Sequence, residues 1–326
     1  MTWQEAVRLI EAARGPADLF GDDAAGRFRR LARLTHPDTS PAAARTQPAY
    51  RRLTALWQQY RGQPHRGGGP GRLVAAGDIA NLYQAGPGLQ KIPRDPADND
   101  LIGREIAALA LLHAGGDPRF ACYLPRLAGR ERQRDPGTGA ARRVSVLGRL
   151  DGFVSLADVR RAYPAGLDPR DAAWIWRRLL VALGFAHRAG VVHGAVLPAH
   201  VMIHPAEHGL ALIDWCYSVL APGDRVPAVV TRYRDWYPPE VAGRRDAGPG
   251  TDIYLATRCM TDLMGGADGR GGRAPRRLTA FAGGCMLRQP SRRPQDAWRL
   301  LAELDDLLGR LYGPRRFRPF AMPAPG

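Results

Sequence analysis

The apolar positions of residues 1–62 recur with the 3.6-residue period of an α-helix. Two helices are predicted there, at about 22–35 and 41–61, after a shorter one at 2–13. The helix at 22–35 opens on carboxylates, which suit the positive end of a helix dipole, and Pro37 ends it. The positions predicted to face inward are Ala24, Phe28, Leu31, Ala32 and Thr35 in this helix and Tyr50, Leu53, Trp57 and Tyr60 in the next.

A stretch rich in glycine and proline follows at 63–72, with the composition of a flexible linker. Short strands separated by glycine turns are then predicted at 71–93. The next segment, 98–115, is predicted to be a helix whose inner face carries Ile102, Ile106, Leu109 and His113. From about residue 156 the pattern is mainly helical. We therefore predict an N-terminal α-helical domain and an α+β two-lobed domain, with a strand-rich lobe at 73–155, a helix-rich lobe at 156–312 and a tail at 313–326.

Composition is that of an ordinary soluble globular protein, because 45% of the 326 residues are hydrophobic and 24% are charged. The longest apolar run is far shorter than the roughly 20 residues that a membrane helix needs. Residues 1–15 also lack the pattern of a signal peptide. The four cysteines lie far apart and form no paired metal-ligand spacing. We therefore expect free thiols, a reduced cytoplasmic setting and no membrane partner.

The net charge of +16 raises the question of nucleic-acid binding. The arginines are spread along the whole chain without a basic aromatic repeat, so we do not expect specific binding to nucleic acid. All but one of the 47 basic residues are arginines, which fits the codon bias of a GC-rich genome. Against that bias the single lysine, Lys91, indicates a site where a compact ammonium is needed, although a lysine acquired by drift is the alternative.

The tripeptide His36-Pro37-Asp38 separates the two predicted helices at 22–35 and 41–61. The outer face of the first of these helices is basic, with Arg29, Arg30 and Arg33. On these features residues 1–62 resemble a J domain, although the helix at 2–13 lacks the usual aromatic start. The resemblance implies that the tripeptide and the basic face bind a bacterial DnaK-type chaperone and stimulate its ATPase. The alternative is a small helical hairpin in which the tripeptide only forms a turn.

Between about residues 71 and 310, seven motifs follow the order of those in the protein kinase fold, which this part of the chain resembles. Gly77 survives from the three glycines of the phosphate-covering loop, whose other two positions are Ala75 and Ala80. Lys91 matches the lysine that holds the α- and β-phosphates of ATP, and Glu105 matches its ion-pair partner on the neighbouring helix.

The later motifs supply a metal ligand and three structural residues. Asp214 matches the Mg²⁺ ligand, with Trp215-Cys216 in place of Phe-Gly. The structural positions that match are Glu240, its predicted ion-pair partner Arg293, and Asp252 at the start of a long buried helix. The resemblance implies ATP as a cofactor, together with Mg²⁺ or Mn²⁺.

The loop at 193–200 departs from the kinase pattern. Aligned on His193 and Pro198, the position of the catalytic aspartate is Ala195, and the position of the asparagine that holds a second metal ion is His200. Ala195 cannot accept a proton from a substrate hydroxyl, and general-base assistance is typically worth 10²–10⁴-fold. Ordinary phosphotransfer should therefore be very slow, which predicts a pseudokinase.

Each histidine of this loop has a structural interpretation. His193 is expected to pack and to bond the backbone near Asp214. His200 is a candidate metal ligand beside Asp214, because imidazole binds Mn²⁺ or Zn²⁺. The alternative favoured by the sequence is that His200 fills space and bonds the loop backbone.

Three functional hypotheses remain. The first is a cytoplasmic J-domain co-chaperone whose kinase-like domain binds nucleotide and acts as a sensor or holds a client protein. The second is a divergent kinase or another ATP-dependent transferase, which would use Asp151 or Asp224 as a different base or bind the nucleotide in a reversed pose. The third is a scaffold that binds no nucleotide. The presence of Lys91, Glu105 and Asp214 argues against the scaffold, and Ala195 argues against the enzyme.

Overall fold

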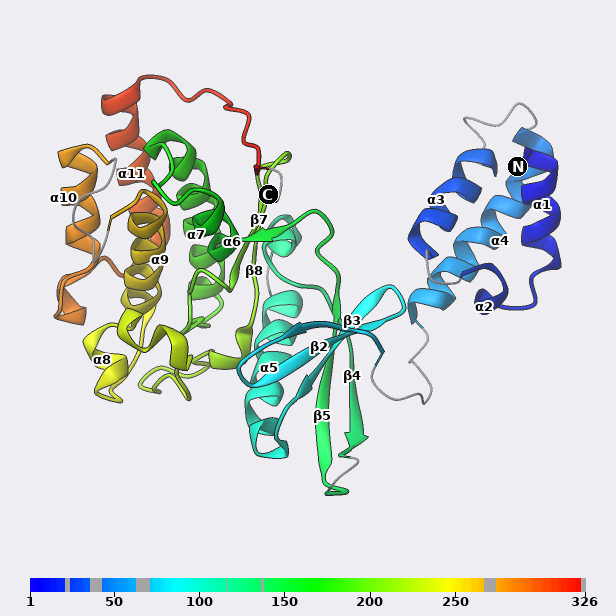
Figure 1. Ribbon diagram of the computed structural model, residues 1–326, viewed down its shortest axis with the longest axis horizontal. Helices are drawn as coiled ribbons and strands as arrows, with labels where there is room; N and C mark the ends of the chain where they lie inside the picture. The colour runs from blue at the N-terminus through cyan, green and yellow to red at the C-terminus, as the bar shows by residue number, and fades with distance from the viewer. Residues whose placement is uncertain are drawn as a thin grey trace.

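The structure is a computed structural model, and it describes residues 1–20, 24–35, 43–62, 71–115, 117–135, 138–266 and 274–323. The chain begins with a group of helices (Figure 1). These are α1 (Trp3–Ala12), α2 (Pro16–Leu19), α3 (Ala24–Thr35) and α4 (Ala43–Gly62). Helix α1 starts at a capping box, in which the Thr2 side chain accepts from the Glu5 amide and the Glu5 side chain accepts from the Thr2 amide.

The N-terminal helices enclose a hydrophobic core of their own. Its centre is aromatic, since the Trp57 ring stacks on Phe28 at 4.7 Å and meets the edge of Phe20 at 5.0 Å. Helix α4 is also fixed to α1 because Arg52 donates to the carbonyl oxygens of Ile10 and Ala13. The short helix α2 was not predicted from the sequence.

The J-domain hypothesis depends on residues that the structure describes only in part. His36, Pro37 and Asp38 lie outside the described residues, and so does the side chain of Arg29. Arg30 and Arg33 are exposed on α3. The structure therefore gives an N-terminal helical region with a basic surface.

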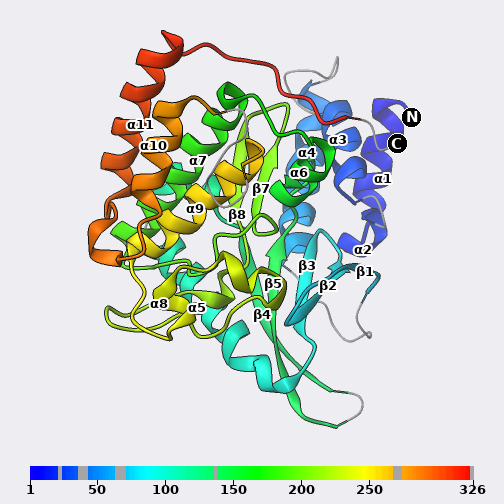
Figure 2. The same cartoon turned by 60° about the vertical axis from the view of Figure 1, so that its left-hand side comes forward.

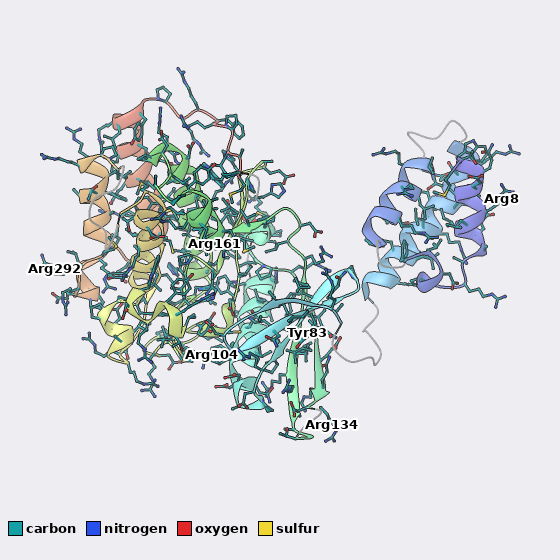
Figure 3. The ribbon with its side chains drawn as sticks, viewed as in Figure 1. Arg8, Tyr83, Arg104, Arg134, Arg161 and Arg292 are labelled. Carbon is teal, nitrogen blue, oxygen red and sulfur yellow. The ribbon has the colours of Figure 1, made fainter. Side chains whose placement is uncertain are left out.

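A five-stranded antiparallel sheet follows, in the order β1-β2-β3-β5-β4. Its strands are β1 (Leu73–Ala76), β2 (Ala80–Ala85), β3 (Gly88–Pro93), β4 (Leu127–Arg134) and β5 (Ala141–Gly148). Helix α5 (Asn99–Gly115) packs across β5 and β4, with the 3₁₀ turns η1 (Pro96–Asp98) and η2 (Pro118–Tyr123) at its two ends. The β4–β5 hairpin extends beyond the helix, with Arg134 near its tip (Figure 3).

The inner face of helix α5 differs in part from the face that the sequence pattern predicted. Ile102 and Leu109 are buried as predicted, but Ile106 is only partly buried and His113 is exposed. The buried stripe instead passes through Leu101, Glu105, Ala108 and Leu112. The prediction of the inner face was partly wrong because periodicity assigns apolar residues to the core, whereas the charged Glu105 occupies a core position here.

The helix-rich lobe is built around a small sheet in the order β6-β7-β8. Its strands are β6 (Val154–Ser155), β7 (Val201–His204) and β8 (Gly209–Leu212). Its helices are α6 (Leu156–Ala162), α7 (Pro169–Arg188), α8 (Pro239–Ala242), α9 (Pro249–Leu263), α10 (Arg276–Cys285) and α11 (Ala297–Tyr312), with 3₁₀ turns η3 (Trp215–Tyr217), η4 (Thr231–Trp236) and η5 (Pro290–Arg292). Because β6 pairs with β7, the chain enters this lobe a few residues before the boundary expected at 155/156.

Helix α7 is the centre of this lobe, where α9 and α11 pack against it and α10 packs on α9 (Figure 2). After α11 the tail runs back along the lobe and buries Phe320 near Tyr163 and Trp174 (Figure 1). One continuous hydrophobic core joins the strand-rich and helix-rich lobes. The described part of the chain is therefore an N-terminal helical region followed by an α+β, two-lobed arrangement.

Membrane-spanning helices are absent from the described ranges, since none of their helices is both long and apolar enough. The four cysteines are free thiols, of which Cys122 is exposed and Cys216, Cys259 and Cys285 are buried.

Candidate nucleotide site

Helix α9 holds the 193–195 loop through the carboxylate of Asp252. The amides of His193 and Gly194 donate to its two oxygens at 2.7 and 2.8 Å, and His187 Nε2 lies 2.9 Å from the first of them. A fully buried carboxylate with several donors forms strong charge-assisted hydrogen bonds. Asp252 therefore fixes the backbone of the 193–195 loop.

His193 is a buried histidine with both ring nitrogens bonded. Its Nε2 donates to the carbonyl oxygen of Ile213 at 2.9 Å, and its Nδ1 accepts from the amide of Ala195 at 3.2 Å. Its ring also meets the edge of Trp215 at 4.6 Å. Burial lowers the pKa of His193 to about 4, although Asp252 opposes this. His193 is thus a neutral side chain that joins the loop to the strand end before Asp214.

Lys91 on β3 lies beside two carboxylates and a thiol. Its Nζ is 2.9 Å from Glu105 Oε1 on α5, 2.5 Å from Asp214 Oδ1 after β8, and 3.1 Å from the Cys216 sulfur. Ser145 on β5 donates to the other oxygen of Glu105 at 2.8 Å. The register pairs Lys91 with Ser145 directly, so neighbouring strands place both groups beside the helix.

The side chains of Lys91, Asp214 and Cys216 shift one another's pKa values. Burial alone would lower the pKa of the Lys91 ammonium, but Asp214 and its neighbours outweigh that effect and raise it well above its ordinary value. Burial would raise the pKa of Asp214, yet the Lys91 ammonium beside it holds it well below its usual range. Burial and Glu105 raise the pKa of the Cys216 thiol. The site therefore contains a lysine cation, an aspartate anion and a neutral thiol.

Asp214 has the left-handed backbone conformation, with φ 68° and ψ 56°. This conformation is uncommon for any residue other than glycine, although aspartate tolerates it better than most. The turn that follows is fixed at both ends. The Trp215 indole donates to the Leu212 carbonyl at 2.8 Å, and Arg104 of α5, which Figure 3 labels, donates to the Ser218 carbonyl at 3.1 Å. Helix α5 thus positions Glu105 and the Asp214 turn together.

His200 bridges the loop and Asp214. Its Nδ1 lies 2.9 Å from the carbonyl oxygen of Ala195, and its Nε2 lies 3.2 Å from Asp214 Oδ2. Its ring stacks on Tyr217 at 5.9 Å, with the two planes 13° apart. The hydrogen bond between His200 and the loop backbone, which was expected from the sequence, is present. The contact between His200 and Asp214 is present as well.

These groups form one end of a cleft of about 440 Å³ between the two lobes. The polar end contains Lys91, Glu105, His200 and Asp214. The apolar part of the wall is formed by Ala80, Leu82, Leu89, Leu147, Met202 and Ile213. A site with apolar walls and a few convergent polar groups is typical of a small-molecule pocket.

The loop over the cleft differs from a glycine-rich loop in charge. A Cβ on Gly77 would lie 2.7 Å from the Ala80 carbonyl oxygen, so the turn between β1 and β2 requires this glycine. The next residue, Asp78, lines the cleft and brings a carboxylate to the loop. Arg232, after β8, lines the cleft as well.

Ala195 is completely buried and does not line the cleft. The end of η3 and the segment after it cover the loop, since a Cβ on the adjacent Gly194 would lie 2.4 Å from the Tyr217 carbonyl oxygen and 3.2 Å from a methyl of Val226. From the sequence we expected this position to face an acceptor substrate. It is instead part of the main hydrophobic core.

The other site residues predicted from the kinase resemblance lie outside the cleft. Glu240 accepts from Arg293 at 2.6 and 2.9 Å and from Thr251 at 3.0 Å, and the Arg293 guanidinium lies 4.8 Å from the Tyr254 ring centre. This group joins α8 to the start of α9 and to η5.

The two carboxylates considered as alternative bases differ in position. Asp151 lines the rim of the cleft and is paired with Arg149 at 2.9 Å. Asp224 is not among the cleft residues. Its amide donates to the Ala221 carbonyl, and its own carbonyl accepts from the Ala247 amide.

Several residues of the site were not identified from the sequence. Cys216 occupied a recognised motif position, but its distance from Lys91 could not be read from spacing. Asp78 lies in the loop that the kinase resemblance assigns to the phosphates, so its negative charge could have been identified from the sequence. Ser145 and Arg104 belong to no motif, because their contacts depend on strand register and helix rotation.

Comparison with known proteins supports a kinase-like relationship over part of the chain. A stretch of 58 residues is 43% identical to casein kinase II subunit alpha' of Saccharomyces cerevisiae. It covers 18% of this chain and 17% of that protein, so the chain spans about a sixth of the length of this relative. No family model matches the chain.

Proposed function

We propose that residues 71–323 form a kinase-like domain that binds ATP together with a divalent metal ion and does not carry out ordinary phosphotransfer. The observation that carries the proposal is the position of Lys91 between Glu105 and Asp214 at the polar end of the cleft. The three N–H donors of Lys91 have Glu105, Asp214 and Cys216 as acceptors, so a phosphate oxygen would replace the Cys216 sulfur, which is the weakest acceptor of the three.

The residues present suit an adenine nucleotide. The apolar walls would enclose the base, and Lys91 would contact phosphate oxygens. Asp214 Oδ2 and His200 Nε2 would hold the metal ion, which when bound neutralises charge on the phosphates. Asp78, in the loop over the cleft, would repel phosphate.

The chain lacks the groups for phosphotransfer in two respects. Ala195 has no atom that can accept a proton, which removes an effect typically worth 10²–10⁴-fold. The same residue is also buried beneath the segment that carries Val226, so an acceptor hydroxyl has no access to it. The site can thus bind and orient a nucleotide without activating an acceptor.

The test is calorimetric titration of the full chain with ATP in the presence of Mg²⁺ or Mn²⁺, combined with a radiolabel assay for transfer to itself and to generic acceptors. Lys91→Ala should lose binding, because it removes the charge that contacts phosphate. Since that change leaves Glu105 buried without its ion-pair partner, the double variant Lys91→Met, Glu105→Gln is the matched control for folding. It should remain folded and also fail to bind.

Two outcomes would replace this proposal. Robust transfer by the unmodified protein, abolished by Lys91→Ala, would establish the enzyme, and Asp151→Asn would then test whether the rim carboxylate is its base. The absence of ATP binding with every metal tested would establish the nucleotide-free scaffold. Asp151→Asn should leave the affinity for ATP unchanged, since Asp151 is already paired with Arg149 at the rim.

We further propose that residues 1–62 form a J domain that recruits and stimulates a bacterial DnaK-type chaperone in the cytoplasm. Support comes from the helices packed around a separate core and from the exposed Arg30 and Arg33 on α3. The tripeptide His36-Pro37-Asp38 directly follows that helix in the sequence. The kinase-like domain would then act as a sensor of nucleotide or as the module that holds a client protein.

The J-domain proposal is tested with residues 1–62 and a purified DnaK-type ATPase. The segment should stimulate ATP hydrolysis, and His36→Gln should abolish stimulation while the helical circular dichroism is unchanged. Reversing the charges of Arg30 and Arg33 should weaken stimulation, and raising the salt concentration should have the same effect. Equal stimulation by the His36→Gln variant would contradict the proposal.

A further inference from the structure

We propose that His200 is a nitrogen ligand that makes the metal site of the nucleotide cleft selective for a divalent transition metal such as Mn²⁺ over Mg²⁺. This inference rests on the proposed nucleotide-binding function and specifies its metal ion. The geometry that carries it is the arrangement of His200 between the Ala195 carbonyl and Asp214.

The hydrogen bond of Nδ1 determines which nitrogen of His200 is available. A carbonyl oxygen can only accept a hydrogen bond, so His200 Nδ1 must carry the proton that it donates to Ala195 at 2.9 Å. In the neutral ring the lone pair is then on Nε2, the atom next to Asp214. Metal-binding histidines are commonly oriented in this way, with the second ring nitrogen bonded to a carbonyl or carboxylate. The loop therefore presents His200 in the tautomer that a metal site needs.

Asp214 supplies the second ligand because its two oxygens have different partners. Oδ1 is 2.5 Å from Lys91 Nζ, whereas Oδ2 lies toward His200. The distance between His200 Nε2 and Asp214 Oδ2 is 3.2 Å. Two ligands at about 2.0–2.2 Å from one metal ion are roughly 2.8–3.1 Å apart at adjacent positions of an octahedron and roughly 3.3–3.6 Å apart at those of a tetrahedron, so the observed distance lies within about 0.1 Å of both ranges. The two atoms are thus spaced as neighbouring ligands of a single ion.

The ring of His200 is also restrained against rotation. It stacks on Tyr217 and is largely buried, with 5% of its surface exposed. A ligand fixed in this way loses little conformational entropy when the ion binds. This restraint separates His200 from a surface histidine that happens to be near a carboxylate.

The chemistry of the ligand pair determines the kind of metal. Mg²⁺ prefers oxygen ligands and near-ideal octahedral geometry, and it is the usual ion where aspartate and asparagine oxygens meet phosphates. Imidazole nitrogen favours first-row transition metals, while phosphate and carboxylate oxygens are acceptable to Mn²⁺. Zn²⁺ generally has three or four protein ligands, whereas the pair of His200 Nε2 and Asp214 Oδ2 supplies two. Mn²⁺ is accordingly the member of the class that we use as a probe.

The first test measures selectivity with the full chain. The affinity for ATP is measured by calorimetry with Mg²⁺ and with Mn²⁺, for the unmodified protein and for His200→Asn. We expect the unmodified protein to bind roughly tenfold or more tightly with Mn²⁺, and we expect His200→Asn, which offers an oxygen ligand, to lose most of that preference. An unchanged ratio in the variant would overturn the inference.

The second test detects the nitrogen ligand directly. Electron spin-echo envelope modulation is recorded for Mn²⁺ bound with the β,γ-methylene analogue of ATP. A ¹⁴N coupling should appear and should be replaced by ¹⁵N coupling when the protein is labelled with [¹⁵N]histidine, which excludes nitrogen from adenine. It should be lost in His200→Asn.

The outcomes distinguish this inference from the function on which it rests. Binding of ATP that depends on Lys91 but shows no histidine coupling would overturn the nitrogen ligand and leave the nucleotide site. In that case His200 would be an imidazolium that donates to Asp214. Failure to bind ATP with any metal would overturn both proposals.

Discussion

His193 illustrates how a single side chain can combine two structural contacts with a pH dependence. Its ring donates to Ile213, accepts from Ala195, and has no exposed surface. A second proton would have to enter at Nδ1, where it would break the bond from the Ala195 amide and leave a charge in the core. This is the physical reason for its low pKa of about 4.

We predict that the free energy of unfolding decreases as the pH falls from about 6.5 to about 4. In that pH range the unfolded chain binds a proton at His193 that the folded chain does not. The contribution of His193 to stability is therefore fully present above about pH 6.5 and is lost as the pH falls toward about 4. The difference between the ordinary value of 6.5 and about 4 corresponds to about 3 kcal/mol. Denaturant titrations at several pH values measure it. His193→Gln, which cannot titrate, should have a distinctly smaller slope, and equal slopes would contradict the assignment.

At the scale of elements, a buried ion pair holds α8 and α9 in the helix-rich lobe. Glu240 and Arg293 are almost fully buried, and Thr251 completes the bonding of the carboxylate. Arg293 also donates to the backbone carbonyls of Leu287 and Arg288. The pair therefore connects the helices to the chain before η5.

We predict that Glu240→Ala lowers the free energy of unfolding by about 3 to 5 kcal/mol, because it leaves Arg293 buried without a counter-charge. Arg293→Met should have a comparable effect. The variant with both substitutions should lose clearly less than the sum, since the second change removes the uncompensated charge. Chemical denaturation of the four proteins completes the cycle. Additive losses would show that the two side chains act independently.

The elements were predicted from the sequence where local pattern determines them. The apolar stripes of α3 and α4 and the strands around Lys91 depend on neighbours in the chain, so periodicity was sufficient. The inner face of α5 was partly missed because Glu105 takes a core position that periodicity assigns to apolar residues. The burial of Ala195 was missed because it depends on Val226, from a segment whose path no local signal indicates.

The same distinction applies to the candidate site. Motif order was enough to nominate Lys91, Glu105 and Asp214, and in the structure each carboxylate lies within 3 Å of the lysine Nζ. It could not give the contact between His200 and Asp214, because that distance depends on two backbone turns packed against each other. Contacts that require the register of distant segments lie beyond what spacing can provide.

The whole molecule has two hydrophobic cores in its described ranges, one in α1–α4 and one shared by the two later lobes. Each core is built from residues contiguous in the chain, which indicates two cooperative units. A ligand that binds one unit should stabilise that unit alone unless the two are coupled.

We predict two transitions in differential scanning calorimetry of the full chain. ATP with Mn²⁺ should raise only the transition of residues 71–323, by a few degrees or more at a hundredfold excess over Kd, where binding contributes about 2.7 kcal/mol. Residues 1–62 alone identify the other transition, and Lys91→Ala should abolish the shift. Movement of both transitions with ATP would show instead that nucleotide binding is communicated to the helical region.

The single lysine gives this protein an unusual chemical property. Apart from the α-amino group, its ε-amine is the one primary amine of the whole sequence, and it lies 6% exposed inside the proposed nucleotide cleft. Amine-selective reagents and enzymes that acetylate or ubiquitinate lysine therefore have a single side chain to modify. Because the raised pKa of Lys91 keeps its amine protonated at neutral pH, prolonged acylation at high pH followed by mass spectrometry should report occupancy of that cleft, with the α-amino group as an internal reference. ATP with metal should protect Lys91 and leave the reference unchanged, even in a crude mixture where no purified assay is possible.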